Sequence, residues 1–360
     1  MNKEKKSDHE TVLVLQGGGS LGAYECGVFK ALDKHNIKFD VIVGTSIGAV
    51  NASIIAGSKR EKASENLENF WLQLAENTTS FFPESLQSYF STLFASTWGN
   101  PHVAVPIFGI PNPWMFSLNQ PYLYDDTPLK KTISDFIDFK KLNLQHPRLI
   151  LTSVDILKGE SISFDNNKIP IDEDHIIASA GYPFYGISWT KKDNRYLWDG
   201  SLLSNTPLRE AIEASPILDK DVYIVSLFPK LQEFLPKNMI ESWHRARDIM
   251  HTDKTEHNVK MSKVISRYLN IIKKMHDILQ NAELDSKSKE EFKKLQPEFH
   301  KLASKRGAII KNIIRIERKE DTNFILEDAD FSLSKIKHLI EEGEHDAEEI
   351  LFQRNPQLQK

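Results

Sequence analysis

Two strand–turn–helix units within the first sixty residues constrain the fold of this chain more than any other feature. Residues 11–16 form a short apolar, β-branched run that ends in three glycines, and apolar residues then recur at helical spacing over 20–35. A second buried run over 39–43 precedes another glycine turn and the small-residue segment 49–56. Strands that alternate with helices in this way predict an α/β fold with a mostly parallel sheet and crossover helices.

The pattern resumes further along the chain, after an irregular interval. Residues 78–125 are rich in aromatic residues and proline, which is typical either of a lid over a site for apolar groups or of a plain wrap over the core. The later predicted elements are helices over 128–136, 174–180 and 207–213 and strands over 148–154, 161–165, 196–198 and 222–228.

Beyond Pro236 we expect helices throughout: one or two long amphipathic helices over 240–279 and short helices over 332–341 and 345–353. Residues 241–320 hold 19 Lys+Arg and 12 Asp+Glu, although the whole chain has a formal net charge of −4. This basic segment predicts either peripheral contact with an anionic membrane or acidic partner, or simply a solvated helical face. Its apolar stripe is also compatible with a homodimer.

Composition excludes several classes of protein. The 360 residues, of which 40% are hydrophobic and 27% charged, are typical of a globular protein, and the acidic balance argues against nucleic-acid binding. The single Cys26 excludes an internal disulfide and a cysteine-based zinc cluster. The charged first ten residues lack the apolar core of a secretory signal, and no segment is apolar enough to span a membrane. We therefore expect a cytoplasmic protein; export by a route that reads no N-terminal signal stays open.

The turn Gly44, Thr45, Ser46, Ile47, Gly48 is a G-x-S-x-G sequence between a predicted strand and a predicted helix. A nucleophile elbow requires this setting, because a tight turn lifts the serine hydroxyl above the strand end and the glycines leave room for neighbouring backbone. The alternative is a packing turn whose serine only caps the helix.

The run Gly17, Gly18, Gly19 ends the first strand and opens the first helix. Consecutive glycines there expose several backbone N–H groups in one concavity, which suits a phosphate or an oxyanion. No Lys-Ser/Thr pair closes the run, and Ser46 stands where a dinucleotide site would have an acidic residue. An oxyanion hole is therefore the favoured interpretation.

A general base for Ser46 is expected at Asp199, which follows the predicted strand 196–198 and precedes Gly200 and Ser201. The alternative role of this aspartate is an Asx-turn or a helix cap. The histidines after Asp199 fall in the predicted helical tail, so a Ser–Asp pair fits the placement better than a Ser–Asp–His triad. An α/β-hydrolase with a histidine base remains a lesser alternative.

Residues 17–24 (GGGSLGAY), 44–49 (GTSIGA) and 199–201 (DGS) resemble the three signature blocks of the patatin-like phospholipase family. The resemblance implies a three-layer α/β/α fold and a Ser–Asp dyad that hydrolyses lipid acyl esters without metal or cofactor. Ser46 would be the nucleophile and Asp199 the base, the amides of the glycine run would form the oxyanion hole, and the intermediate would be an acyl-serine. Further segments, including 204–208 and 343–347, are similar to a bacterial subgroup with a C-terminal helical extension.

Two departures from the family pattern bear on substrate. Leu21 stands where many members have a basic residue, which removes a phosphate contact, and the dyad turn is Asp-Gly-Ser rather than Asp-Gly-Gly. The resemblance implies a catalytic domain over 11–230, with the lid-like insertion at about 78–125, and a helical extension over 236–360. The natural ester stays open, and a non-catalytic membrane- or partner-binding protein with the same fold is the alternative function.

Overall fold

The computed structural model describes residues 9–75, 91, 99–107, 121–144, 146–216, 218–232, 235–306, 309–319 and 327–354. The aromatic segment expected over 78–125 lies mostly outside these residues. Its described parts include a short antiparallel pair, β3 (Val105–Pro106) with β4 (Tyr124–Asp125).

The described residues form one eight-stranded central sheet with the order β10-β9-β1-β2-β5-β8-β7, and β6 also pairs with β5. The five strands from β10 to β5 are mutually parallel, whereas β6, β7 and β8 are antiparallel additions at one edge. The strands are β1 (His9–Leu15), β2 (Val41–Thr45), β5 (Arg148–Asp155), β6 (Glu160–Asp165), β7 (Thr190–Lys192), β8 (Arg195–Asp199), β9 (Asp219–Ser226) and β10 (Ile310–Glu317).

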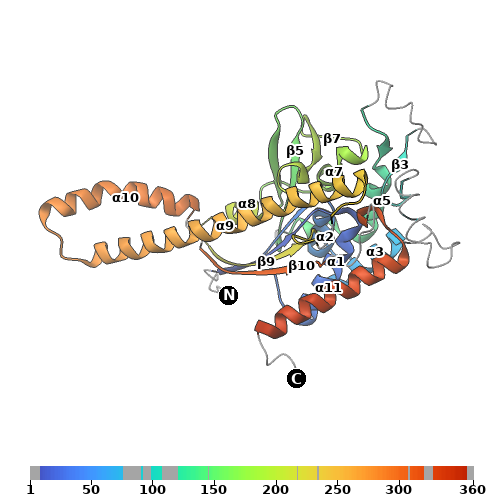
Figure 1. Cartoon of the computed structure of the whole chain (residues 1–360). Coiled ribbons are helices and arrows are strands. Elements are labelled where there is room, and N and C mark those ends of the chain that lie inside the picture. The colour runs from blue at the N-terminus through green and yellow to red at the C-terminus, as the bar shows by residue number, and fades with distance from the viewer. Residues whose placement is uncertain are drawn as a thin grey trace.

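Helices cover both faces of this sheet, because alternate residues of the central strands are apolar on both sides. On β1, Leu13 and Leu15 belong to the large core, which lies under α1 (Gly22–Lys34), α3 (Ala63–Ala75) and α11 (Leu333–Arg354). Val12 and Val14 belong to a smaller core under α8 (Leu208–Ala214) and α9 (Met239–Asn281). Figure 1 shows the sheet between these two helical layers. The predicted three-layer arrangement with a mostly parallel sheet is thus confirmed.

The helices longer than one turn are α1 (Gly22–Lys34), α2 (Ile47–Ala56), α3 (Ala63–Ala75), α5 (Thr127–Phe136), α6 (Phe139–Leu142), α7 (Glu173–Ala180), α8 (Leu208–Ala214), α9 (Met239–Asn281), α10 (Ser286–Arg306) and α11 (Leu333–Arg354). In the first half of the chain, α1, α2, α5 and α7 match the expected helices, whereas α3 and α6 were not expected from the sequence. Short 3₁₀ turns lie at η1 (Gly19–Leu21), η3 (Pro183–Tyr185), η4 (Gly200–Leu202) and η5 (Glu327–Ala329).

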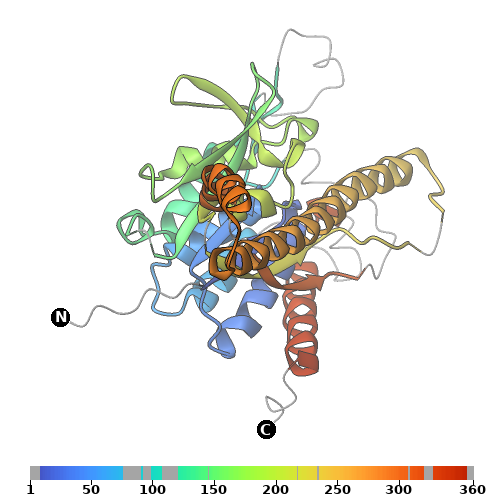
Figure 2. The same ribbon diagram turned by 90° about the vertical axis from the view of Figure 1, so that its left-hand side faces the viewer.

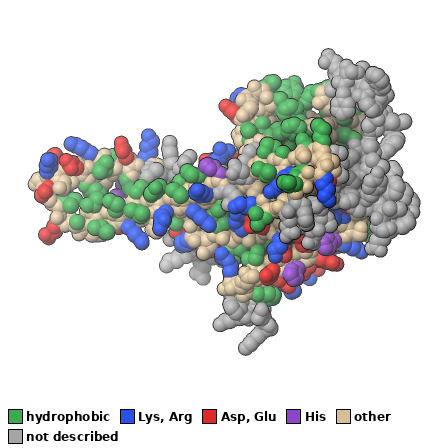
Figure 3. Space-filling model, in the orientation of Figure 1, with side chains coloured by type: hydrophobic (Ala, Val, Ile, Leu, Met, Phe, Trp, Pro, Cys, Tyr) green, Lys and Arg blue, Asp and Glu red, His purple; other side chains and the backbone are tan. Residues whose placement is uncertain are grey.

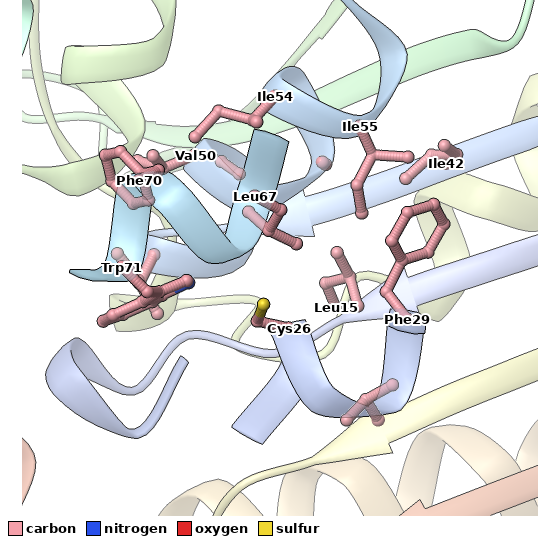
Figure 4. Close-up of a cluster of buried hydrophobic side chains, with 14 of the residues drawn as sticks. Leu15, Cys26, Phe29, Ile42, Val50, Ile54, Ile55, Leu67, Phe70 and Trp71 are labelled. Carbon is pink, nitrogen blue, oxygen red and sulfur yellow. The ribbon is translucent and has the colours of Figure 1, made fainter. Parts of the chain in front are cut away.

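Cys26 lies on α1 within the large core, where it is fully buried. Its thiol points among the side chains of Leu67, Trp71 and Leu15 (Figure 4). Burial raises the pKa of this thiol well above its usual value, so the residue contributes packing rather than a reactive thiolate.

Two expectations for the C-terminal third are wrong. Residues 310–317 are not helical but form β10, which pairs in parallel with β9 and extends the central sheet. The two short helices expected over 332–341 and 345–353 are the single helix α11, which packs against α1. The division into domains at 230–236 remains a prediction, but β10 and α11 pack as part of the α/β body.

The long helix α9 was expected and continues over 43 residues. Its first half covers the sheet, and its second half extends away from the body and pairs with α10 as a helical hairpin (Figures 1 and 2). At the base of the hairpin, the backbone N–H of Ile310 donates to Ser266 Oγ at 3.1 Å. No helix of the described chain is both long enough and apolar enough to cross a membrane.

Candidate active site

Ser46 occupies a strained turn between β2 and α2. Its φ of 57° and ψ of −128° are sparsely populated for a residue with a side chain. A Cβ on Gly44 would lie 2.2 Å from the carbonyl oxygen of Gly48, and a Cβ on Gly48 would lie 2.6 Å from the carbonyl oxygen of Leu15. Both glycines are therefore required by close backbone packing, as the elbow interpretation expects.

Asp199 lies beside this turn because of the sheet register. Thr45 pairs with Thr152 on β5, and the next residue of β5, Ser153, pairs with Asp199 at the end of β8. A Cβ on Gly200 would lie 2.4 Å from Thr152 Oγ1, so the chain can turn here only with glycine. The sheet thus brings the predicted nucleophile and the predicted base together across β5.

The carboxylate of Asp199 is fully buried but not fully paired. Oδ1 accepts a hydrogen bond from the backbone N–H of Ser201 at 2.8 Å, whereas Oδ2 completes none with the residues that the structure describes. Burial raises the pKa of Asp199 to about 6, although interactions with the Ser46 side chain and with Ser201 lower it. A carboxylate with this pKa is charged at neutral pH and is more basic than an exposed aspartate.

The three glycines of the first turn are not equivalent. The N–H of Gly17 donates to the carbonyl oxygen of Asn205 at 3.3 Å, whereas the N–H groups of Gly18 and Gly19 have no such bond within the described chain. A Cβ on Gly17 would lie 2.8 Å from Ser46 Cβ, so the run passes directly beside the serine. Gly18 and Gly19 are therefore the members of the run whose amides can receive an oxyanion.

The structure adds Ile47 to the candidate donors. The carbonyl oxygen of Ser46 accepts the N–H groups of Ala49 and Val50, but the N–H of Ile47 has no bond to the residues described here. The amide after the nucleophile is a usual oxyanion donor at an elbow, so the G-x-S-x-G sequence itself could have identified it.

A network of buried polar side chains holds the two turns, and sequence reasoning missed its role. Ser179 Oγ accepts the N–H of Ser46 at 3.1 Å and donates to the carbonyl oxygen of Thr152 at 2.6 Å. Thr45 Oγ1 donates to the carbonyl oxygen of Ser204 at 2.8 Å. These bonds hold Thr45 and the N–H of Ser46 in place, and no local pattern marks them in the sequence.

A cavity of about 620 Å³ opens over these groups, with Ser46, Ile47 and the three glycines of the run in its wall. Its lining is mainly apolar and aromatic, which is typical of a site for an apolar ligand. Aromatic members of the wall are Tyr122, Tyr124, Tyr182, Phe184, Tyr185, Phe228, Trp243 and Phe331. Leu21 is not in this wall but packs in the large core, so it offers the cavity no polar contact.

The structure also contains a histidine and a cluster of residues of metal-ligand types that are not part of the Ser46–Asp199 pair. His251 of α9 lines the cavity and stacks on Phe228, with ring centroids 5.0 Å apart. His345, Asp346 and Glu349 lie close together on α11, away from the cavity wall, and Asp346 already accepts a hydrogen bond from Tyr24.

Comparison with known proteins identifies the family of this chain. A family model described as patatin-like phospholipase matches residues 13–212. The chain belongs to the patatin-like phospholipase family. The match covers both glycine turns and Asp199, and it ends before α9.

Individual relatives match over short segments of the chain. Lysophospholipase nte1 of Aspergillus terreus is 52% identical over 44 residues, which cover 12% of this chain and 3% of that protein. Triacylglycerol lipase SDP1L of Arabidopsis thaliana is 31% identical over 71 residues, which cover 20% and 9% of the two chains. The matched segments thus span less than a tenth of these relatives.

Among solved structures, VipD from Legionella pneumophila is similar with a TM-score of 0.38 and 13% identity, over 96% of this chain and 67% of that chain. The type III effector protein ExoU is similar with a TM-score of 0.33 and 14% identity, over 96% and 53%.

Proposed function

We propose that this chain is a serine acyl hydrolase that cleaves acyl esters of lipids through Ser46 and Asp199. Asp199 accepts the proton of Ser46 as its oxygen attacks the ester carbonyl, and the amides of Gly18, Gly19 and Ile47 receive the developing oxyanion. The proton passes to the leaving alcohol, which departs and leaves an acyl-serine. Water then attacks the acyl group, Asp199 takes its proton, and the fatty acid leaves as the serine is reprotonated.

One observation carries this proposal: a buried carboxylate with an uncommitted oxygen lies beside a serine in a strained turn, at the wall of a mainly apolar cavity. A serine that only capped a helix would bond to the first backbone N–H groups of α2, and Ser46 makes no such cap. The apolar wall favours an acyl chain, and family relatives named lysophospholipase and triacylglycerol lipase support a lipid ester.

The test is hydrolysis of p-nitrophenyl esters of increasing acyl length by the purified full chain, followed by lipid profiling. Ser46→Ala and Asp199→Asn should each lower kcat by at least about 10³-fold, while the circular dichroism spectrum stays unchanged. Ser53→Ala, which alters a buried serine of α2 that donates only to the carbonyl oxygen of Ala49, is the matched control. Turnover that survives in Ser46→Ala would contradict the proposal.

The α9–α10 hairpin supports a second role, peripheral contact with an anionic membrane. Apolar side chains run along the hairpin in Figure 3, and basic side chains lie along its edges together with some acidic ones. In the described chain the most exposed apolar members of the hairpin are Tyr268, Met275, Ile278 and Leu295, which are 56–68% exposed. An apolar stripe flanked by lysines suits the interface of an anionic bilayer. The expected cytoplasmic location stays a prediction.

Flotation with vesicles of phosphatidylcholine and phosphatidylserine tests this role. Binding should fall with added salt and in a variant that carries Lys273→Glu and Lys274→Glu, whereas Lys158→Glu, on an exposed turn of the body, should bind normally. Equal binding to neutral vesicles would contradict the role. Dimers in sedimentation that dissociate in Tyr268→Ser would instead assign the stripe to a second copy. Vesicle binding without any ester hydrolysis would favour the non-catalytic alternative.

A further inference from the structure

A short turn from the C-terminal third packs directly against the glycine run. Ser20, next to Gly19, donates through Oγ to the carbonyl oxygen of Glu327 at 3.0 Å. Gly19 has a φ of +57°, and a Cβ on it would lie 2.4 Å from the carbonyl oxygen of Asp328. Two successive carbonyl groups of η5 thus contact two successive residues of η1, and the hydrogen bond from Ser20 is buried.

The side chain of Glu327 fixes η5 to the sheet. Its two carboxylate oxygens accept Nη1 and Nη2 of Arg318 at 2.9 and 2.8 Å, and Lys335 donates to the same carboxylate at 2.7 Å. Arg318 Nε also donates to the carbonyl oxygen of Leu227 at 3.1 Å. The side chain of Leu227 packs against Gly18, because a Cβ on Gly18 would lie 2.7 Å from Leu227 Cδ1. The guanidinium of Arg318 therefore binds both Glu327 of η5 and the backbone of Leu227, whose side chain packs against Gly18.

The side chain of Asp328 connects η5 to the wall of the cavity. Its carboxylate accepts hydrogen bonds from Tyr185 and from Arg247 of α9. The guanidinium of Arg247 is held from its other side by Asp248 at 3.0 Å. Tyr185, Arg247 and Asp328 all line the cavity, and Arg247 and Asp328 are buried whereas Tyr185 is partly buried. A charged cluster thus packs behind the backbone contact with Gly19.

We infer that η5 is a clamp that positions the amides of Gly18 and Gly19 for the oxyanion. Glycine backbone is intrinsically permissive, so three consecutive glycines hold one orientation only when their surroundings impose it. Glu327 and Asp328 impose it through their carbonyl groups, and their side chains anchor those carbonyls. The clamp rests on the proposed hydrolase function, and it gives η5 and its anchors Arg318 and Lys335 a role in positioning the oxyanion donors, although the family match ends at residue 212.

Ser20→Ala is the cleanest test, because it removes one hydrogen bond to the clamp and no contact with substrate. We expect kcat for a p-nitrophenyl ester to fall by about tenfold, with KM changed less than twofold, since small displacements of oxyanion donors are costly. The acid limb of the pH–rate profile should not move, because Asp199 is untouched. Ser53→Ala is the matched control: Ser53 is equally buried and also donates to one carbonyl group.

A fluorophosphonate supplies a second readout, because its phosphoryl oxygen needs the same donors. Its second-order rate with Ser46 should fall in Ser20→Ala by the same factor as kcat, and Asp328→Asn, which weakens the pairing with Arg247, should show the same loss. Rates equal to those of Ser53→Ala in both variants would overturn the clamp alone. If the wild-type protein is not labelled at Ser46 and Ser46→Ala still hydrolyses ester, the hydrolase proposal and the clamp both fall.

Discussion

At the scale of single residues, the proposed chemistry depends on the charge of Asp199. Burial raises its pKa to about 6, and the base must be deprotonated to accept the proton of Ser46. We therefore expect kcat/KM to be constant above about pH 7 and to fall about tenfold per unit below pH 6. The measurement is a pH–rate profile with a soluble ester.

The control for this prediction addresses the histidine alternative, because a histidine base would titrate in a similar range. His251 lines the cavity, and His251→Gln should leave the acid limb where it is. A limb that disappears in His251→Gln would assign the base to that histidine rather than to Asp199.

Burial of the charged Asp199 carboxylate also lowers the stability of the folded state at neutral pH. Its folded pKa of about 6 lies above the value of 3.8 for an unperturbed aspartate, so the folded state binds the proton more tightly. Stability contributed by this group is then present below about pH 4 and is lost as pH rises through about 6. Two pKa units at about 1.4 kcal/mol each give at most about 3 kcal/mol.

Asp199→Asn should therefore unfold at a higher urea concentration than the wild type at pH 8, and the difference should vanish near pH 4. The asparagine side chain of this variant keeps an oxygen for the N–H of Ser201, which preserves the turn. An inactive variant that is less stable than the wild type at pH 8 would contradict the idea that burial of the charge opposes folding.

How far the site could be predicted from the sequence differs between residues. The glycine turns and Asp199 carry local signals, because tight turns at strand ends need glycine whatever the rest of the chain does. No local signal shows that the N–H of Gly17 donates to the carbonyl oxygen of Asn205 and is therefore unavailable to an oxyanion, because the two residues are 188 positions apart in the sequence. Sequence therefore indicates which residues meet at the site, but not which amides remain available there.

At the scale of helices and strands, the close pair α1–α11 depends on two glycines. A Cβ on Gly343 would lie 2.1 Å from the carbonyl oxygen of Tyr24, and a Cβ on Gly27 would lie 1.9 Å from that of Ile340. Gly343→Ala should lower the free energy of unfolding by about 2–3 kcal/mol, because α11 must move away from α1. The measurement is urea unfolding of Gly343→Ala beside Glu341→Ala, a control at an exposed neighbouring position. If the two variants were equally stable, the helices would have room to separate.

Gly343 also explains why α11 was expected as two helices. A glycine in the middle of a helical pattern usually marks an end, but here it permits close packing on α1. Strand β10 was missed for a related reason, because its partner β9 lies far earlier in the sequence and its own residues are flanked by lysine-rich segments. Long-range pairing overrode the local pattern in both cases.

At the scale of the whole molecule, the C-terminal third divides into a part that completes the fold and a part that projects from it. β10 and α11 complete the sheet and cover the large core, and η5 contacts the glycine run. Within the hairpin, His276 of α9 stacks on Phe299 of α10, with ring centroids 3.8 Å apart. The basic charge of 241–320 is therefore shared between two different structural roles.

Two deletions should separate these roles. A chain that ends at residue 236 should be insoluble or unfolded, because it loses a strand of the central sheet and the helix that covers α1.

A chain in which a short Gly–Ser linker replaces residues 271–301 should fold and keep at least about a third of the wild-type kcat on a soluble ester, because the linker joins opposed ends of the hairpin. The same chain should no longer float with anionic vesicles. Circular dichroism, esterase assay and flotation on both deletions decide the matter, and a folded, active chain of residues 1–236 would show instead that the family-matched region forms a complete domain.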